Sequence, residues 1–286
     1  RFGRDVTACA EATAQALLAR RDQWDAIWFH EQDPADPAQQ AFCASLARHG
    51  LLHGRVPSSQ CPYLRLQGTW PEFLASKSQK FRKNLRAARN KLQSGGPLHY
   101  QSHSGDARRL QSLFTEYEEL EGRSWKAKAA VGVSQSVEHL RFYRHLIDQF
   151  GDTGQFILRS MHVGDQLVAA TFGLVQGRTF YSLHITHDAS YAKFSPGTLL
   201  ESLELEECFG ADLDEYDFLG GFLKNKVRWA TQIRDTVEVH LYQRQPHLVA
   251  AHAFYFAIKP PLKRLLSRLG VRWPGQARTD RAEPAD

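Results

Sequence analysis

Hydrophobic residues recur every three or four positions over most of the first 150 residues, the period of helices with one buried face. In the clearest case Phe81, Leu85, Ala88 and Leu92 share one face, and six cations surround the other. Residues 69–72 (T-W-P-E) have the form of a capping box. The pattern predicts helices at residues 7–20, 38–49, 77–91, 106–120 and 137–150, short strands at residues 24–30, 63–67 and 98–103, and a loop containing residues 125–128.

The period changes to two near residue 155, which indicates consecutive strands. The predicted strands are residues 155–163, 166–175 and 178–186. Tight-turn signals at Gly164-Asp165 and Gln176-Gly177 make neighbouring strands antiparallel. A helix at residues 196–209 leads to a strand at residues 215–219, which must run parallel to the third strand. We therefore expect an α/β (α+β) fold with a mixed, mostly antiparallel sheet flanked by helices.

The remaining C-terminal pattern is shorter. Residues 225–231 read as one or two helical turns, residues 236–242 as a final strand, and residues 248–269 as a helix interrupted at Pro260-Pro261. The polar tail at residues 274–286 is expected to be disordered.

The junction between the third strand and the following helix is the sharpest chemical feature. Ser195 suits an N-cap and Pro196 suits the first helical position. Gly197 lacks a side chain where a diphosphate would approach the backbone, and Thr198 adds a hydroxyl. An anion site is one interpretation. An ordinary helix start is the other, and these four residues alone favour it.

Composition narrows the partners only slightly. A net charge of +5 and a pI near 9.0 suit an anionic partner without choosing among a nucleotide, a lipid headgroup and RNA. The four cysteines form no paired motif, and no carboxylate or cysteine completes a ligand set with the histidines, so we expect free thiols, no metal site and a cytoplasmic protein. Because the chain begins at Arg1, we also expect upstream sequence to be missing.

Several motifs resemble one family in the expected order. Residues 188–200 match D-x-x-Y-x-x-x-x-P-G-x-x-L, residues 216–220 and 226–229 resemble D-F-x-x-G and Y-K-x-x-W, residues 80–86 resemble K-x-R-x-N-x-R, and residues 125–126 resemble a W-K element. Together they resemble the BioF-like and CelD-type acetyltransferases, which belong to the GNAT superfamily and are related to the FemAB transferases.

That resemblance implies a GNAT fold and four regions. We expect a reduced or truncated GNAT-like lobe with the basic helix at residues 1–95, a GNAT acyltransferase domain at 96–245, an amphipathic basic helix at 246–273 and the tail at 274–286.

The resemblance also implies an acyl-CoA donor, chiefly acetyl-CoA, and a small-molecule or glycan acceptor in polysaccharide or cell-envelope synthesis. The residues expected to bind the donor are Tyr191, Ser195, Gly197, Thr198 and Leu199. Backbone N–H groups there would also stabilise the oxyanion of the reacting thioester.

Catalytic residues are harder to assign. Asp217 matches the family pattern as a general base, and Lys226 is expected to stabilise charge or bind the acceptor, although it also reads as a solvated lysine. Asn225 stands where the family has tyrosine, so another group must protonate a leaving thiolate if that tyrosine does so in the family. Three further carboxylates, at Glu118, Glu119 and Glu121, are weaker candidates for the base.

Three functions remain open. The leading one is acyl transfer from CoA to an amine or hydroxyl. The second is aminoacyl transfer from tRNA, with RNA bound through residues 77–91 and a steep dependence on salt. The third is a binding module whose catalytic site has decayed, which Asn225 supports best.

The basic C-terminal segment predicts peripheral contact with the inner face of a membrane. From Pro261 to Trp273, apolar residues alternate with cations and no acidic residue occurs. Each cation adds about 1 kcal/mol near an anionic leaflet, which makes the attachment reversible. We expect the chain to sediment with anionic vesicles at low salt and a chain ending at residue 245 to lose this. Equal sedimentation of both chains would contradict the prediction.

Overall fold

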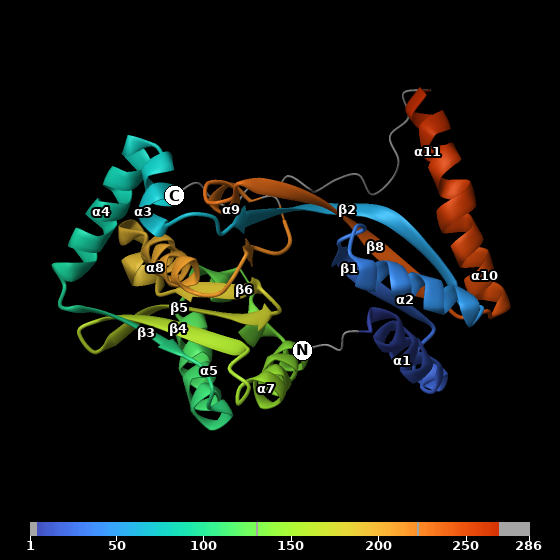
Figure 1. Ribbon diagram of the computed structural model, residues 1–286, viewed down its shortest axis with the longest axis horizontal. Helices are drawn as coiled ribbons and strands as arrows, with labels where there is room; N and C mark the ends of the chain where they lie inside the picture. The colour runs from blue at the N-terminus through green and yellow to red at the C-terminus, as the bar shows by residue number, and fades with distance from the viewer. Residues whose placement is uncertain (1–4, 130, 222, 269–286) are drawn as a thin grey trace. The chain divides into compact units, whose positions relative to one another are not determined.

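The computed structural model describes residues 5–129, 131–221 and 223–268 (Figure 1). The chain forms two compact units. Unit 1 comprises Arg1–Cys61, Gly220–Phe222 and Arg234–Asp286, and unit 2 comprises Pro62–Leu219 and Leu223–Ile233. Unit 2 includes the basic helix that the sequence places before a boundary at residue 95. The four predicted domains remain a prediction.

The sheet of unit 2 has the strand order β2-β7-β6-β5-β4-β3. All its neighbours are antiparallel except β6 and β7, which run parallel. The strands are β2 (Leu52–Arg65), β3 (Leu98–His103), β4 (Phe156–Val163), β5 (Gln166–Gln176), β6 (Thr179–His187) and β7 (Glu215–Asp217). The predicted meander and the parallel strand after it are confirmed. Strand β2 starts well before the predicted strand. The sequence pattern missed its first half, because those residues are mostly polar and half-buried.

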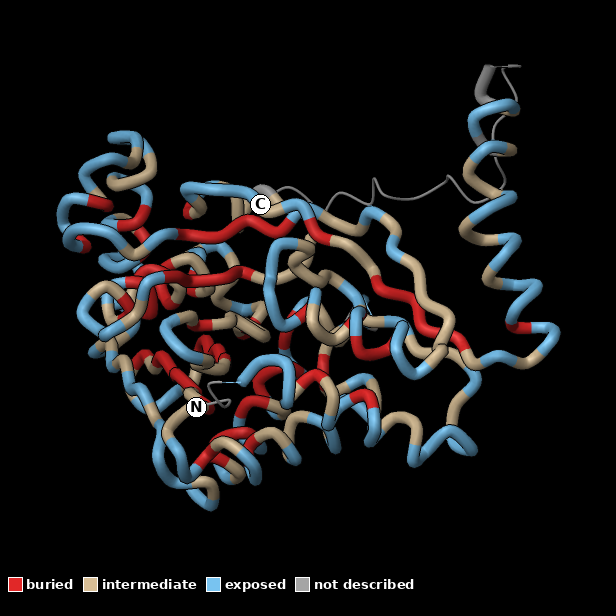
Figure 2. The backbone as a smooth tube through the Cα atoms, turned by 45° about the vertical axis from the view of Figure 1, so that its right-hand side comes forward, coloured by how far each residue is buried: buried red, intermediate tan, exposed pale blue. Residues whose placement is uncertain are grey.

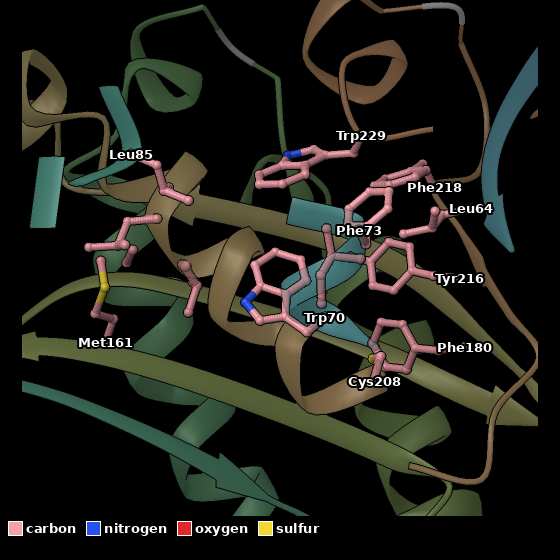
Figure 3. Packing of buried hydrophobic residues seen from close by; sticks show 14 of the residues in the cluster. Leu64, Trp70, Phe73, Leu85, Met161, Phe180, Cys208, Tyr216, Phe218 and Trp229 are labelled. Carbon is pink, nitrogen blue, oxygen red and sulfur yellow. The ribbon is translucent and has the colours of Figure 1, made fainter. Parts of the chain in front are cut away.

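Helices cover both faces of this sheet (Figure 1). Helices α3 (Trp70–Ser76), α4 (Gln79–Gln93) and α8 (Pro196–Gly210) lie on one face, and α5 (Ala107–Gly122) and α7 (Val137–Phe150) lie on the other. Each face has its own apolar core. Figure 3 shows Trp70, Phe73, Tyr216 and Trp229 in the core beneath α8.

Local capping explains where several helices begin. The predicted capping box is confirmed, because Thr69 and Glu72 bond reciprocally at the start of α3. The prediction of a loop at residues 125–128 is wrong. These residues form the short helix α6 (Trp125–Lys128), because the Ser124 side chain accepts the Lys126 N–H at its start. Another short helix, α9 (Lys224–Val227), follows β7.

Unit 1 has the strand order β1-β8-β2, with β1 at Ala26–Gln32 and β8 at Gln232–Tyr242. Helices α1 (Val6–Leu18) and α2 (Pro37–Arg48) pack together in this unit. Its core includes Ala14, Leu46 and Leu241.

The C-terminal helix differs from its prediction. Helix α10 (Pro246–Ala253) continues through a π-helical turn (Phe254–Ile258) into α11 (Lys259–Arg268), so the expected interruption at Pro260-Pro261 is wrong. A proline at position 260 donates no backbone hydrogen bond, and the wider turn just before it absorbs the mismatch.

The π-helical turn of this helix packs against β2 within unit 1. The Phe256 ring occupies the space beside Gly54, where an added Cβ would lie 2.3 Å from the ring. Figure 2 shows α11 mostly exposed or half-buried. The expected membrane contact extends into residues 269–273, and the expected disordered tail is 274–286. Both lie outside the described residues. No helix in the described part of the chain is long and apolar enough to cross a membrane.

A buried ionic cluster attaches α8 to the sheet. The Arg159 guanidinium on β4 is 2% exposed and donates to both Glu207 oxygens, over 3.0 and 3.1 Å. It also lies 3.6 Å from Glu204, one turn earlier on α8, and Tyr216 donates to Glu204. Burial opposes ionisation of Glu207, but its bonds from Arg159 keep its pKa below the usual range. Burial raises the pKa of Glu204.

We expect Arg159→Leu to lower the free energy of unfolding by about 3 kcal/mol, because it leaves two carboxylates without their buried cation. The matched control is Arg178→Leu, since Arg178 pairs with Asp212 and Asp214 at the surface. That change should cost at most about 1 kcal/mol. Urea denaturation measures both, and equal losses would contradict a structural role for the cluster.

Candidate functional site

Strands β6 and β7 pair over only three residues. Thr179–Tyr181 lies beside Glu215–Asp217, and beyond these positions β6 continues to His187 with no pairing to β7. A 3-10 helix (Ala189–Phe194) then leads into α8. The predicted junction therefore lies at the end where the two parallel strands separate.

The segment before α8 is held by side chains. Asp188 accepts hydrogen bonds from Ser190 and from Arg123 Nε, the latter over 3.0 Å. Burial would raise the pKa of Asp188, but these bonds lower it. The Tyr191 hydroxyl donates to Gln166 over 3.0 Å, and the Tyr191 ring packs near Phe194. Tyr191 thus helps to fix the approach to the helix.

Ser195 is the N-cap residue of α8, as predicted, but its side chain makes no capping hydrogen bond. Its backbone is left-handed, with φ 51° and ψ 51°, whereas a capping serine needs extended backbone to aim its oxygen at the first amides. Pro196 is the first helical residue, as predicted.

The amides at the start of α8 differ in availability. The Leu199 N–H donates to the Ser195 carbonyl over 3.2 Å, and the Leu199 side chain lies in the core. Among the described residues, no backbone bond uses the amides of Gly197 and Thr198. A Cβ at Gly197 would lie 3.4 Å from His187 Nδ1 and 3.9 Å from the Ile185 side chain. The backbone that can bind an anion is thus at Gly197 and Thr198.

The two predicted catalytic residues meet at the end of β7. Asp217 is 4% exposed, and its Oδ1 accepts the Leu219 N–H over 2.7 Å. The Lys226 ammonium donates to the Leu219 carbonyl over 3.2 Å. The side-chain oxygen of Asn225 is buried and has no hydrogen-bond partner among the described residues.

Lys126 contacts strand β6. Its ammonium donates to the Ile185 carbonyl on β6 over 2.7 Å and lies 3.9 Å from Glu121. Glu121 is fully buried, and it accepts the Ser134 N–H and the Tyr117 hydroxyl. The other two weaker base candidates lie elsewhere: Glu118 pairs with Arg144, and Glu119 is exposed.

His184 is a residue whose setting the sequence did not reveal. His184 lies on β6, and its Nε2 is hydrogen-bonded to the Tyr143 hydroxyl at 2.8 Å. Burial, together with the charges of Lys126 and Lys226, lowers the pKa of His184 to about 3, so the imidazole is neutral at physiological pH. Within the described residues, no group of three or more His, Cys, Asp or Glu side chains is arranged to hold a metal ion.

Glu201 is a second group that sequence reasoning missed. It lies one turn after Gly197 on the same face of α8, and its carboxyl accepts the Trp229 indole N–H over 2.5 Å. Burial raises the pKa of Glu201 to about 8 against the attraction of Arg228. No sequence signal marked this residue, because a glutamate on a helix usually faces solvent.

Comparison with known proteins identifies one matching family. The sequence model described as "Acetyltransferase (GNAT) domain" matches residues 79–255, which include α4, the meander, α8 and the end of β7. No curated protein sequence matches the chain.

Solved structures share the fold. FemX is 11% identical, with a TM-score of 0.57 over 87% of this chain and 80% of that chain. The C-terminal domain of a putative lysylphosphatidylglycerol synthetase from Agrobacterium fabrum is 10% identical, with a TM-score of 0.53 over 86% of this chain and 77% of that one. At these identities the similarity shows a common fold.

The raised pKa of Glu201 makes stability depend on pH. Between pH 5 and pH 8 the folded protein keeps a proton that the unfolded chain releases, so stability falls as the pH rises. We expect Glu201→Gln to gain stability relative to wild type over this range, by at most about 1.4 kcal/mol per pH unit. Thermal unfolding at pH 5 and pH 8 measures this. The exposed Glu206→Gln is the control, and a pH-independent difference for Glu201→Gln would contradict the assignment.

Proposed function

The chain belongs to the acetyltransferase (GNAT) domain family, and from that premise we propose that it transfers an acyl group from acyl-CoA to an amine or hydroxyl acceptor. The mixed, mostly antiparallel sheet flanked by helices agrees with the GNAT fold expected from the sequence. The proposal rests on one observation. Among the described residues, the N–H groups of Gly197 and Thr198 make no backbone hydrogen bond, and they lie at the end where β6 and β7 separate.

The start of α8 suits a diphosphate. Unpaired N–H groups and the positive end of the helix dipole favour a bound anion. Gly197 presents backbone without a side chain, and the Thr198 hydroxyl and Ser195 lie beside it. We propose these three residues as the diphosphate contacts, with Tyr191 holding the preceding segment and Leu199 anchoring the helix in the core.

The proposed reaction needs little covalent chemistry from the protein. The acceptor nitrogen or oxygen attacks the thioester carbonyl and loses its proton. The carbon–sulfur bond then breaks, and the departing thiolate takes up a proton. Protein groups orient the carbonyl and stabilise its developing negative charge. The Lys126 ammonium binds the Ile185 carbonyl on β6, and the Lys226 ammonium binds the Leu219 carbonyl just after β7, so both supply positive charge near the end where the strands separate.

The ordered motifs support a finer assignment to the BioF-like and CelD-type branch. We propose a glycan or cell-envelope precursor as acceptor on the same grounds. A reduced GNAT-like lobe before the matched region remains part of this proposal.

Aminoacyl transfer from tRNA is the second candidate, and helix α4 favours it. Its exposed surface carries Lys80, Lys83, Arg86, Arg89 and Lys91. No Asp or Glu occurs between Glu72 and Asp106, and these cations form no ion pair within the described residues. Such a surface suits a phosphate backbone, and binding there would weaken steeply as salt rises.

We expect Gly197→Glu to abolish binding of acetyl-CoA while the protein stays folded. The carboxylate would occupy the anion position and repel the diphosphate. Gly197→Gln is the matched control, because it has nearly the same size without the charge and should retain more affinity. Isothermal titration calorimetry measures binding, and circular dichroism confirms folding.

The same titrations decide between the candidates. Unchanged acetyl-CoA affinity in Gly197→Glu would rule out the donor site. Binding of aminoacyl-tRNA with a steep salt dependence, and none of acetyl-CoA by wild type, would favour the second candidate. Failure of wild type to bind either ligand would favour a decayed binding module.

A further inference from the structure

Leu219 has a backbone conformation that leucine rarely adopts. Its φ is 54°, and the described chain contains only two other non-glycine residues with positive φ, Glu31 and Ser195. The left-handed conformation is unfavourable because it brings Cβ too close to the following carbonyl oxygen. Such residues persist where surrounding contacts over-determine them, and they cluster at functional sites. Ser195 and Leu219 lie at the start of α8 and at the end of β7.

Both backbone polar groups of Leu219 are bound by side chains. Asp217 Oδ1 accepts its N–H over 2.7 Å, and Lys226 donates to its carbonyl over 3.2 Å. The Asp217 contact spans two residues, the geometry by which an aspartate fixes a local turn. The Lys226 contact brings a side chain from seven positions later in the sequence to the same backbone unit.

The burial of Asp217 argues against proton transfer. Its side chain is 4% exposed and one oxygen is committed to an amide. A base must reach the proton that it removes, whereas a carboxylate that fixes a turn has no such requirement. The contacts therefore fit a role in positioning backbone better than a role in chemistry.

We propose that Asp217 and Lys226 form a clamp that holds Leu219 in its left-handed conformation, and that this clamp sets the end of β7 against which the acyl end of the donor is placed. Both are then positioning residues. The clamp itself rests on geometry alone, and its effect on the acyl group rests on the proposed function.

A double-mutant cycle tests the clamp without any substrate. Leu219→Gly inserts the residue for which a positive φ has no steric cost. Lys226→Met removes the donor to the carbonyl and keeps an unbranched apolar stem. We expect Lys226→Met to lower the midpoint of thermal unfolding by about 3 °C in the wild-type background, and by less than half as much beside Leu219→Gly.

Lys126→Met is the matched control for this cycle. Lys126 also donates to a strand carbonyl, that of Ile185, but the backbone of Ile185 is not left-handed. Its effect should be the same in both backgrounds. If the effects of Lys226→Met and Leu219→Gly are additive, the clamp is wrong.

The affinity ratio between acetyl-CoA and CoA reports where the acyl group sits. We expect Lys226→Met and Asp217→Ala to change this ratio at least threefold while CoA affinity stays within twofold. Asp217→Asn should keep the wild-type ratio, because the amide oxygen still accepts the Leu219 N–H. Lys226→Arg should also keep the wild-type affinity ratio, because arginine keeps an N–H donor.

If Asp217→Asn changes the acetyl-CoA to CoA affinity ratio as much as Asp217→Ala does, the positioning role is overturned. That result would show that the charge of Asp217 matters and its hydrogen bond does not. If wild type binds neither CoA nor acetyl-CoA, the proposed donor fails, and the stability cycle still decides whether the clamp exists.

Discussion

The buried contact between Arg159 and the carboxylates of α8 is the constraint on which the candidate site depends. It joins β4, the neighbour of the edge strand β3, to a helix whose first turn carries the proposed anion contacts. Apolar packing alone would allow a helix to slide or rotate, whereas a desolvated guanidinium accepts only a narrow geometry. The position of Gly197 relative to β6 therefore follows from a contact three turns further along the helix.

One face of α8 links this anchor to the site. Gly197, Glu201, Glu204 and Glu207 follow one another at helical spacing, so one face of the helix carries a half-buried glycine followed by three carboxyl groups. The first carboxyl accepts the Trp229 indole, and the other two contact Arg159. Trp229 also packs against Phe81 of α4. The same helix thus connects the donor end, the basic helix and the segment after β7.

Local signals were sufficient for much of the fold. Period-two alternation and two glycine turns gave the meander, and a helical connection forced β7 to run parallel to β6. They were insufficient wherever tertiary contacts decide. The burial of Glu201 and the neutral state of His184 depend on residues distant in sequence, and the left-handed backbone of Ser195 and Leu219 is one that serine and leucine rarely adopt, so no local pattern predicts it. The π-helical turn before Pro260 was missed because proline signals a break without specifying where the chain absorbs it.

The Phe256 ring and Gly54 form a socket that constrains sequence change in unit 1. Any side chain at position 54 would overlap the ring, and a smaller residue at position 256 would leave a void beside the sheet. A substitution at either position alone would disturb this packing, so we expect the two residues to be substituted together. Substitutions in the C-terminal helix and in β2 are therefore coupled at this contact, although the two elements lie far apart along the chain.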